Sequence, residues 1–464
     1  MIYIVVLAIV VSILVAVTVV KTMSIRNKAD FMVAGRSLPW YVLVFTLLSS
    51  WIGAGSLFGG AENAYRNGFA ALWQAAGGWL GLILIAFIAG RARRFAQFTV
   101  PDLLESRYNA TARVLGSIAI VVSCVVITSY QFIGGGDILH LIFPEIEKTT
   151  GMYIIAAFVI LFTAAAGMAS VAYLDLFIGS LVTITVIVAV PLLLDHVGGW
   201  SYVRLNLPDD HFQVLGHLTI WQALGFTIPT MLLLIGNQGM YQKFFSARSE
   251  RDASYAVFGW IAGALLLETL LVTVAVIGSS VFKLDNPREI LPTTAKLGLP
   301  PLVGAILLGG MFAKVISTAN NFLFSPSTNI VHDVYARFIN RNASERKTLL
   351  VSRLTVVALG ILALLQGAYF KSILAASLYA YTIYGAAVTP SVMAVFFWKR
   401  ANAQGAVSSI FLGTIVTIAW QWSGSGIDAI YPALGASVAA LIGVSLLTPP
   451  PAPEKVNPFF ASKT

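Results

Sequence analysis

Charged side chains are scarce in this sequence, and cysteine is nearly absent. Asp, Glu, Lys and Arg make up 11% of the 464 residues, whereas 58% of the residues are hydrophobic. A water-soluble protein of this length needs far more polar surface, so the composition excludes a soluble protein. The single cysteine, Cys124, lies inside an apolar stretch, which excludes a disulfide framework.

Long apolar stretches accompany this lack of charge. A run of about 20 apolar residues spans a bilayer core of about 30 Å. The first run is too long for a signal-peptide core, and no small-residue cleavage site follows it before Lys21, so we expect it to be retained. The pattern predicts an all-α polytopic membrane protein with about thirteen transmembrane helices and no soluble domain. The thirteen stretches lie at about 2–21, 40–61, 69–90, 111–136, 150–171, 173–194, 216–240, 255–282, 300–325, 349–368, 371–398, 404–423 and 429–447.

The net charge of +9 is distributed as a topology signal. Every second connection between apolar stretches is rich in Lys and Arg: these connections hold 21 of the 29 residues, including Lys243. The other connections hold seven, and Lys314 lies inside an apolar stretch. The positive-inside rule then places the N-terminus outside and the C-terminus in the cytoplasm, across a plasma (inner) membrane. We expect the lipid bilayer to surround the protein, and we expect neither a nucleic-acid partner nor an obligate protein partner.

Two of the stretches contain residues that interrupt a helix. The stretch 40–61 has four glycines after residue 52, each of which weakens a helix by about 1 kcal/mol relative to alanine. The stretch 216–240 contains Pro229 and Gly236. Unwound backbone at membrane depth persists where it lines a cavity or is buried in protein. Such breaks at corresponding places in two halves indicate a transporter with its binding site near the bilayer midplane. Close helix packing by small residues is the alternative explanation for the glycines.

The breaks also suggest how the chain is divided. Each begins one half of a ten-helix core that runs from 40 to 398, and the halves are placed at 40–194 and at 216–368, with the tenth core helix (371–398) beyond the second range. An odd number of helices per set gives the two copies opposite orientations in the membrane. We therefore expect an inverted repeat of five plus five helices. An extra N-terminal helix (1–22) precedes it, and flanking helices (371–447) and a cytoplasmic tail (449–464) follow. The prolines from Pro449 end the last helix, and we expect disorder beyond them.

Adjacent hydroxyls in the stretch 300–325 suggest a cation site. Ser317 and Thr318 offer two oxygen ligands of the kind that a hard cation prefers. Each hydroxyl can instead bond back to a carbonyl of its own helix. The pair indicates ion binding only if it lies beside a broken helix.

Four segments, together and in this order, make the sequence resemble the sodium:solute symporter family, which includes sodium-coupled proline, pantothenate, sugar and choline transporters. The resemblance covers about residues 23–440, and a fifth segment, Gly167–Asp175 (GMASVAYLD), also fits it. It implies a LeuT-type fold with sodium-driven alternating access. The four segments are Phe31–Leu38 (FMVAGRSL), Thr99–Asn109 (TVPDLLESRYN), Asn237–Lys243 (NQGMYQK) and Ile316–Leu323 (ISTANNFL).

The resemblance also implies a set of ion-binding residues. Na⁺ is the expected coupling ion. Asp175 matches a carboxylate on the family's cytoplasmic ion-release path, although a surface aspartate at a helix end is the simpler explanation. The implied sodium ligands are the backbone carbonyls of Ser49, Ile52 and Lys314 and the hydroxyls of Ser317 and Thr318.

The solute is expected beside the breaks, where polar side chains face the bundle interior. Gly239 stands where sugar-transporting relatives have an aromatic gate residue, which argues against a sugar. We expect a small polar organic solute and no covalent chemistry, so the protein is not expected to be an enzyme. The candidate contacts are Ser56, Gln74, Asn237, Gln238, Tyr381 and Thr382.

Two charged residues lie within apolar stretches, where ionisable groups are costly and are functional candidates. Glu268 is expected to pair with Lys314 or with a polar neighbour on another helix, and it is a candidate for ion passage or coupling. Lys314 shares a helix face with Ser317 and Thr318. Its ammonium group is therefore a candidate tethered cation. In that alternative the protein is a sodium-independent or proton-coupled carrier on the same fold. A membrane sensor or a channel is a weaker alternative.

Overall fold

The computed structural model describes residues 1–22, 33–95, 97–165, 168–367, 369–370 and 372–460. Nearly all of these residues are helical, and the β-structure among them is limited to an isolated bridge between Leu38 and Ala247. The all-α prediction is confirmed. The α-helices are α1 (Ile2–Thr22), α3 (Trp40–Trp51), α4 (Ala61–Asn67), α5 (Leu72–Ala86), α6 (Ala89–Phe95), α7 (Val100–Arg107), α8 (Ala110–Ile142), α9 (Lys148–Ala165), α10 (Met168–Val197), α11 (Gly199–Asn206), α12 (Ile220–Gly236), α13 (Gln238–Ser246), α14 (Glu250–Val281), α15 (Ile290–Leu297), α16 (Pro301–Thr328), α17 (Glu345–Gly367), α18 (Ile373–Ala387), α19 (Thr389–Phe397), α20 (Ala403–Trp422), α21 (Ile430–Leu447) and α22 (Pro453–Phe460).

The number of membrane-spanning helices is close to the thirteen expected. Within the described residues, eleven helices are long and apolar enough to cross a bilayer, and the count is up to twelve if α18 and α19, bent by 41°, form one span. The short helix α3 is apolar but has only 12 residues. It supplies the first half of the interrupted stretch 40–61, so the expected count is approximate.

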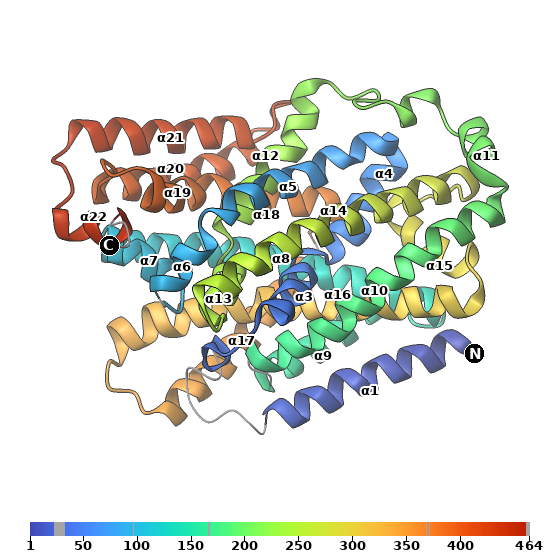
Figure 1. Ribbon diagram of the computed structural model, residues 1–464, viewed down its shortest axis with the longest axis horizontal. Coiled ribbons are helices and arrows are strands. Elements are labelled where there is room, and N and C mark those ends of the chain that lie inside the picture. The colour runs from blue at the N-terminus through green and yellow to red at the C-terminus, as the bar shows by residue number, and fades with distance from the viewer. Residues whose placement is uncertain (23–32, 96, 166–167, 368, 371, 461–464) are drawn as a thin grey trace.

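The helices run across Figure 1 in the same general direction, with α1 along one edge and α20 and α21 at the opposite edge. The span Pro301–Ile339 contains α16, and 83% of its most apolar segment is buried inside the protein. The corresponding share for the span Ile2–Val20, in α1, is 22%. The helix α16 therefore forms the centre of the bundle, and α1 packs on its outside against α16 and α10. The helices α20 and α21 pack against each other, joined by a hydrogen bond of 2.8 Å between the hydroxyls of Ser409 and Ser437.

The first break lies where α3 ends. Ile52 is extended (φ −90°, ψ 94°), and a wide π-helical turn, η2 (Gly55–Gly60), continues into α4. A side chain at Gly53 does not fit, because a Cβ atom there would lie 2.6 Å from the side chain of Thr318. Glycine thus allows the unwound backbone to touch α16. This confirms the predicted interruption and explains why it needs a small residue.

The second break separates α12 from α13. Asn237 leaves the helical conformation (φ −59°, ψ 114°), and its side-chain oxygen accepts from the amides of Gly239 at 2.9 Å and Met240 at 3.3 Å. This cap begins a new short helix in the middle of the bundle. The break therefore falls at the Gly236–Asn237 junction rather than at Pro229, which remains inside α12.

The expectation of disorder beyond the prolines is wrong for residues 453–460. They form α22, and the ring of Phe459 stacks on that of Phe95 with 4.4 Å between centroids. The ring of Phe459 thus docks the segment onto α6. Residues 461–464 lie outside the described part of the chain.

Candidate functional site

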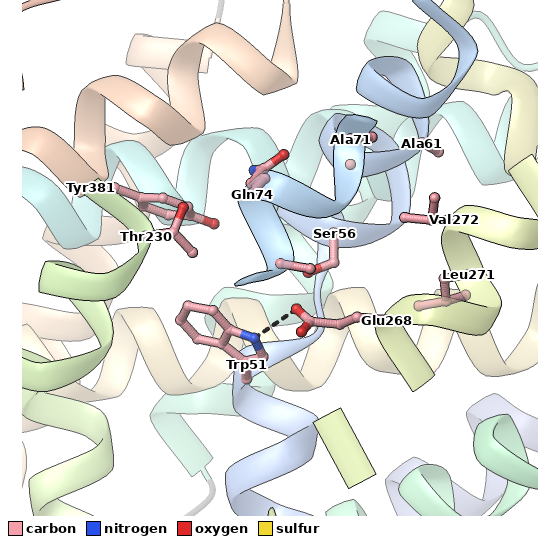
Figure 2. Close-up of a pocket in the computed structure, with 12 residues that line it drawn as sticks. Trp51, Ser56, Ala61, Ala71, Gln74, Thr230, Glu268, Leu271, Val272 and Tyr381 are labelled. Carbon is pink, nitrogen blue, oxygen red and sulfur yellow. Dashed lines mark hydrogen bonds between the residues drawn. The ribbon is translucent and has the colours of Figure 1, made fainter. Parts of the chain in front are cut away.

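A small cavity lies beside the first break. Helices α3, α5, α12, α14 and α18 and the turn η2 contribute its walls. Figure 2 shows Glu268 and Trp51 joined in the lower part of the view, with Tyr381, Thr230 and Gln74 above them. The lining residues are Trp51, Ser56, Gly60, Ala61, Ala71, Gln74, Ala75, Thr230, Glu268, Leu271, Val272 and Tyr381.

Glu268 is held by two tryptophans. The indole Nε1–H of Trp51 donates to Glu268 Oε1 at 2.8 Å, and that of Trp79 donates to Oε2 at 2.8 Å. The side chain of Glu268 is buried. No ion pair involves it within the described residues. Of the two kinds of partner expected from the sequence, the structure therefore has the polar neighbours and not Lys314.

A second buried carboxylate, Asp175 of α10, also bonds a residue of α3. The hydroxyl of Thr46 donates to Asp175 Oδ2 at 2.5 Å, and the hydroxyl of Ser317 donates to Asp175 Oδ1. Asp175 is fully buried, so the structure does not place it at the protein surface. Its position on an ion path remains a prediction.

Two lysines accompany Asp175. Lys243 Nζ donates to the carbonyl of Thr46 at 3.0 Å and to the hydroxyl of Ser50. Lys314 Nζ is fully buried and has no hydrogen-bond partner within the described residues, and it lies within Coulombic range of Asp175 and Lys243. We call Asp175, Lys243 and Lys314 the lysine–aspartate cluster.

The burial of Lys243 corrects the sequence analysis. We counted Lys243 among the charges of a cytoplasmic connection, but its side chain has no exposed surface. The last turn of α13 carries it back into the bundle beside α3. The count of charges placed Lys243 in a connection because the residue follows the second break closely. Hydropathy does not show that the chain continues inside the bundle after that break.

The structure brings together part of the expected sodium set. Thr318 Oγ1 donates to the carbonyl of Ser49 at 3.0 Å, where α3 ends, and Ile52 is the extended residue of the break. The hydroxyl of Ser317 points instead to Asp175. The carbonyls and the Thr318 hydroxyl are ligands of the type that suits a hard cation.

The expected solute contacts divide into two groups. Ser56, Gln74 and Tyr381 line the cavity. Asn237, Gln238 and Thr382 are buried but do not line it. Gln238 instead bridges helices: its Oε1 accepts from the amide of Val100 at 2.5 Å, and its own amide donates to the hydroxyl of Tyr384 at 2.7 Å. The side-chain nitrogens of Asn237 and Gln238 have no partner within the described residues.

An ion network joins α7 to α8 and to the helical turn of residues 329–339 that follows α16. Arg113 pairs with Asp102, Glu105 and Asp333, and the contact to Asp333 Oδ1 is 2.7 Å. Asp102, His332 and Asp333 bring ligand atoms within 4.8 Å of one another. The guanidinium of Arg113 already bonds both aspartates, so the group resembles a structural ion network more than a metal site. Burial alone would raise the pKa of Asp102, but the hydrogen bond with His332 and the charge of Arg113 hold that pKa below its usual value.

Comparison with known proteins decides the family. Residues 31–413 match the sodium:solute symporter family. The chain belongs to this family. It is a secondary active transporter and not an enzyme.

The relatives are similar along at least 80% of their own length and 85% of this chain. The osmoregulated proline transporter OpuE of Bacillus subtilis is 24% identical over 91% of this chain and 90% of its own. The high-affinity proline transporter PutP of the same organism is 26% identical over 93% and 95%. Sodium/proline symporters of Staphylococcus aureus are 25% identical.

Solved structures show the same fold. A Na⁺-coupled sialic acid symporter, in a substrate-bound outward-open state, superposes with a TM-score of 0.83 at 17% identity, covering 97% of this chain and 98% of its own. The nucleobase-cation-symport transporter Mhp1 gives 0.62 at 12% identity, with 94% and 99% covered. The LeuT-type fold expected from the sequence is confirmed.

Proposed function

We propose that this transporter couples the inward movement of sodium to the uptake of a small polar organic solute. The observation that carries the proposal is the contact between the Thr318 hydroxyl and the Ser49 carbonyl. It joins a broken helix to the central helix at a point rich in oxygen ligands. Together with the family, this arrangement supports a sodium position beside the cavity, where ion and solute binding are coupled.

In this proposal the ion is held by the implied ligand set. The carbonyls of Ser49, Ile52 and Lys314 and the hydroxyls of Ser317 and Thr318 coordinate it. Two of these groups already have partners: Thr318 bonds Ser49 directly, and Ser317 bonds Asp175. Binding of sodium would replace the first bond and turn Ser317 away from the second. Asp175 is then free to receive the ion on its way to the cytoplasm.

One observation favours a second candidate. The ammonium group of Lys314 is fully buried one helical turn from Thr318, with no hydrogen-bond partner within the described residues. A fixed cation at this place can fill the role of sodium. The protein would then be a sodium-independent carrier on the same fold.

The wider arrangement is part of the proposal. The repeats are assigned to 40–194 and 216–368, preceded by the helix of 1–22 and followed by the flanking helices of 371–447 and the tail of 449–464. The protein is placed in the plasma (inner) membrane with its N-terminus outside and its C-terminus in the cytoplasm. The lysine and arginine distribution supports this orientation.

The sodium proposal is tested without knowledge of the solute. Thermal unfolding of the purified protein is measured while Na⁺ replaces K⁺ at constant ionic strength. A bound ion stabilises the folded state, so the unfolding temperature should rise with Na⁺ and not with K⁺. Thr318→Val should weaken this response at least tenfold. Thr417→Val is the matched control, because its hydroxyl bonds the Gly413 carbonyl of its own helix at 2.7 Å, in α20.

The same titration separates the two candidates. A wild-type protein that responds equally to Na⁺ and K⁺ contradicts sodium coupling and favours the fixed Lys314 ammonium. Uptake into proteoliposomes at fixed pH and membrane potential then serves as a second measurement. Solute accumulation that follows an inward sodium gradient supports the symporter, and accumulation independent of sodium supports the alternative.

A further inference from the structure

We propose that the central cavity binds a small organic cation, an amine or a quaternary ammonium ion, and that Glu268 is its counter-charge. The inference rests on the proposed transport of a small polar solute and narrows the class of that solute. It concerns the cavity of Figure 2 and not the sodium position beside Thr318.

The charges around the cavity favour a cation. Glu268 is the one formally charged side chain among the described residues that line it, and no lysine, arginine or histidine faces it there. The hydrogen bonds that Glu268 accepts come from neutral indoles. They bond the carboxyl group without supplying a positive charge, and a buried carboxylate without a counter-charge is costly. A cationic ligand supplies the missing charge.

The walls favour an organic cation over a bare metal ion. The Trp51 indole and the Tyr381 ring both line the cavity, and aromatic faces attract ammonium groups. Leu271, Val272 and Ala75 add apolar surface that suits carbon atoms of a ligand.

One further group points to a ligand. The side-chain oxygen of Gln74 is buried on the cavity wall and has no hydrogen-bond partner within the described residues. Buried polar atoms in folded proteins are nearly always satisfied. An N–H or O–H group on the cation would donate to Gln74 while its charge faces Glu268.

A zwitterionic amino acid fits the cavity less well. Its carboxylate needs donors, and broken helices can provide them through free backbone amides. Here the side-chain oxygen of Gln131 accepts from the Ala54 amide at 2.8 Å, and Asn237 caps the amide of Gly239. The carboxylate of the amino acid would also meet the like charge of Glu268. The relatives compared above are named as proline transporters, so the proposal separates this chain from them.

The experiment compares ligands that differ in charge but not in shape. Thermal unfolding of the purified full chain, in sodium-containing buffer, is followed with choline, ethanolamine and tetramethylammonium as cations. The neutral probe is 3,3-dimethylbutan-1-ol, in which a carbon atom replaces the nitrogen of choline. L-Proline is the zwitterionic probe. We expect at least one cation to raise the unfolding temperature, with its apparent affinity at least tenfold above that of either comparison probe.

Two variants locate the effect. Glu268→Gln keeps the size of the side chain and removes its charge, so it should weaken cation binding at least tenfold. Glu250→Gln is the matched control. It makes the same change on the same helix, 18 residues and about 27 Å away, where Glu250 pairs with Arg94 at 3.2 Å on the surface. It should bind cations as the wild type does. The comparison of choline with its neutral analogue needs no variant, so it stands even if Glu268→Gln does not fold.

Each other outcome overturns the proposal. The inference is wrong if no cation in the panel binds, if the neutral analogue or proline binds as well as the cations, or if Glu268→Gln binds cations normally. Loss of the inference is distinguishable from loss of the proposed function. A wild-type protein that is stabilised by sodium and by proline remains a sodium-coupled symporter with a different solute.

Discussion

Glu268 and Asp175 are both buried carboxylates near the first break, but the formal net charge of the groups around each has the opposite sign. Asp175 has two lysines within Coulombic range and two hydroxyls bonded to its oxygens. Glu268 has two indoles and an adjoining cavity. Counted formally, the lysine–aspartate cluster has one positive charge in excess and the cavity has one negative charge. The lysines of the protein balance the charge of Asp175, whereas we propose that a ligand balances the charge of Glu268.

This difference suggests a division of roles. The lysine–aspartate cluster ties α3, α10, α13 and α16 together at the place where sodium is proposed to bind. The cavity is lined by Trp51 and Ser56 on either side of the same break. Four experiments test the comparison, in order of decreasing expected effect.

The largest effect is expected when Asp175 loses its charge. Asp175→Asn leaves Lys243 and Lys314 buried without a counter-charge, and leaving a buried charge uncompensated costs about 3–5 kcal/mol of unfolding free energy. Thermal unfolding in detergent measures the loss. The double variant Asp175→Asn with Lys243→Met should recover more than half of it. Simple addition of the two single effects would contradict a charge-balanced cluster.

A smaller effect is expected from the tryptophans that hold Glu268. Trp79→Phe removes one donor to a charged group, a loss of about 1.5–3 kcal/mol. Trp73→Phe is the control, because its indole donates to the carbonyl of Val214 at 2.9 Å on the exposed surface. It should cost less than half as much. Equal losses in the two variants would show that Glu268 gains nothing special from its indole donors.

The next prediction concerns sodium and the excess positive charge of the cluster. Lys314→Met removes one buried ammonium group from beside the proposed ion position. The sodium concentration for half-maximal stabilisation should fall about tenfold, which corresponds to ~1.4 kcal/mol. Lys283→Met, whose ammonium donates to the carbonyl of Ser279 at 2.9 Å at the end of α14, serves as control. A sodium response identical in all three proteins would place Lys314 outside the ion's influence.

The smallest effect is expected at a third carboxylate, Asp102, which lies outside the spans and is balanced by Arg113. Its pKa in the folded protein is below the ordinary value of 3.8. Its contribution to stability is therefore complete above that value and is lost as the pH falls through the lower, folded pKa. Unfolding temperatures of wild type and Asp102→Asn should differ by a constant amount between pH 5 and 7 and should converge below about pH 4. A difference that shrinks between pH 7 and 5 would contradict this assignment.

Features that depend on local composition could be predicted from the sequence. The apolar stretches, the glycine-rich break and the hydroxyl pair beside it are all visible in short segments, and the contact of Thr318 with Ser49 agrees with them. Glu268 was also recognisable, because a carboxylate within an apolar stretch stands out.

Features that depend on distant contacts could not be predicted. Trp51 lies 217 positions from Glu268 in the sequence, and an indole donor cannot be distinguished there from ordinary apolar lining. Lys243 looked like one more cytoplasmic charge, and only the packing of α13 against α3 shows that it is buried. The roles of Asn237 and Gln238 were similarly hidden, because a helix cap and a bridge to Val100 have the same polar composition as a binding site.

The two indoles that bond Glu268 also make the intrinsic tryptophan fluorescence of the transporter a measure of ligand binding. Tryptophan emission responds to nearby charge, because the electric field of a charge a few ångströms away is strong in a poorly polarisable interior. Trp51 and Trp79 touch the same carboxylate from two helices, so a cation arriving there changes the field at both rings at once. Among the ten tryptophans of the chain, these two will dominate the spectral difference between empty and loaded protein. Stopped-flow fluorescence can therefore follow the loading of the cavity without any attached dye.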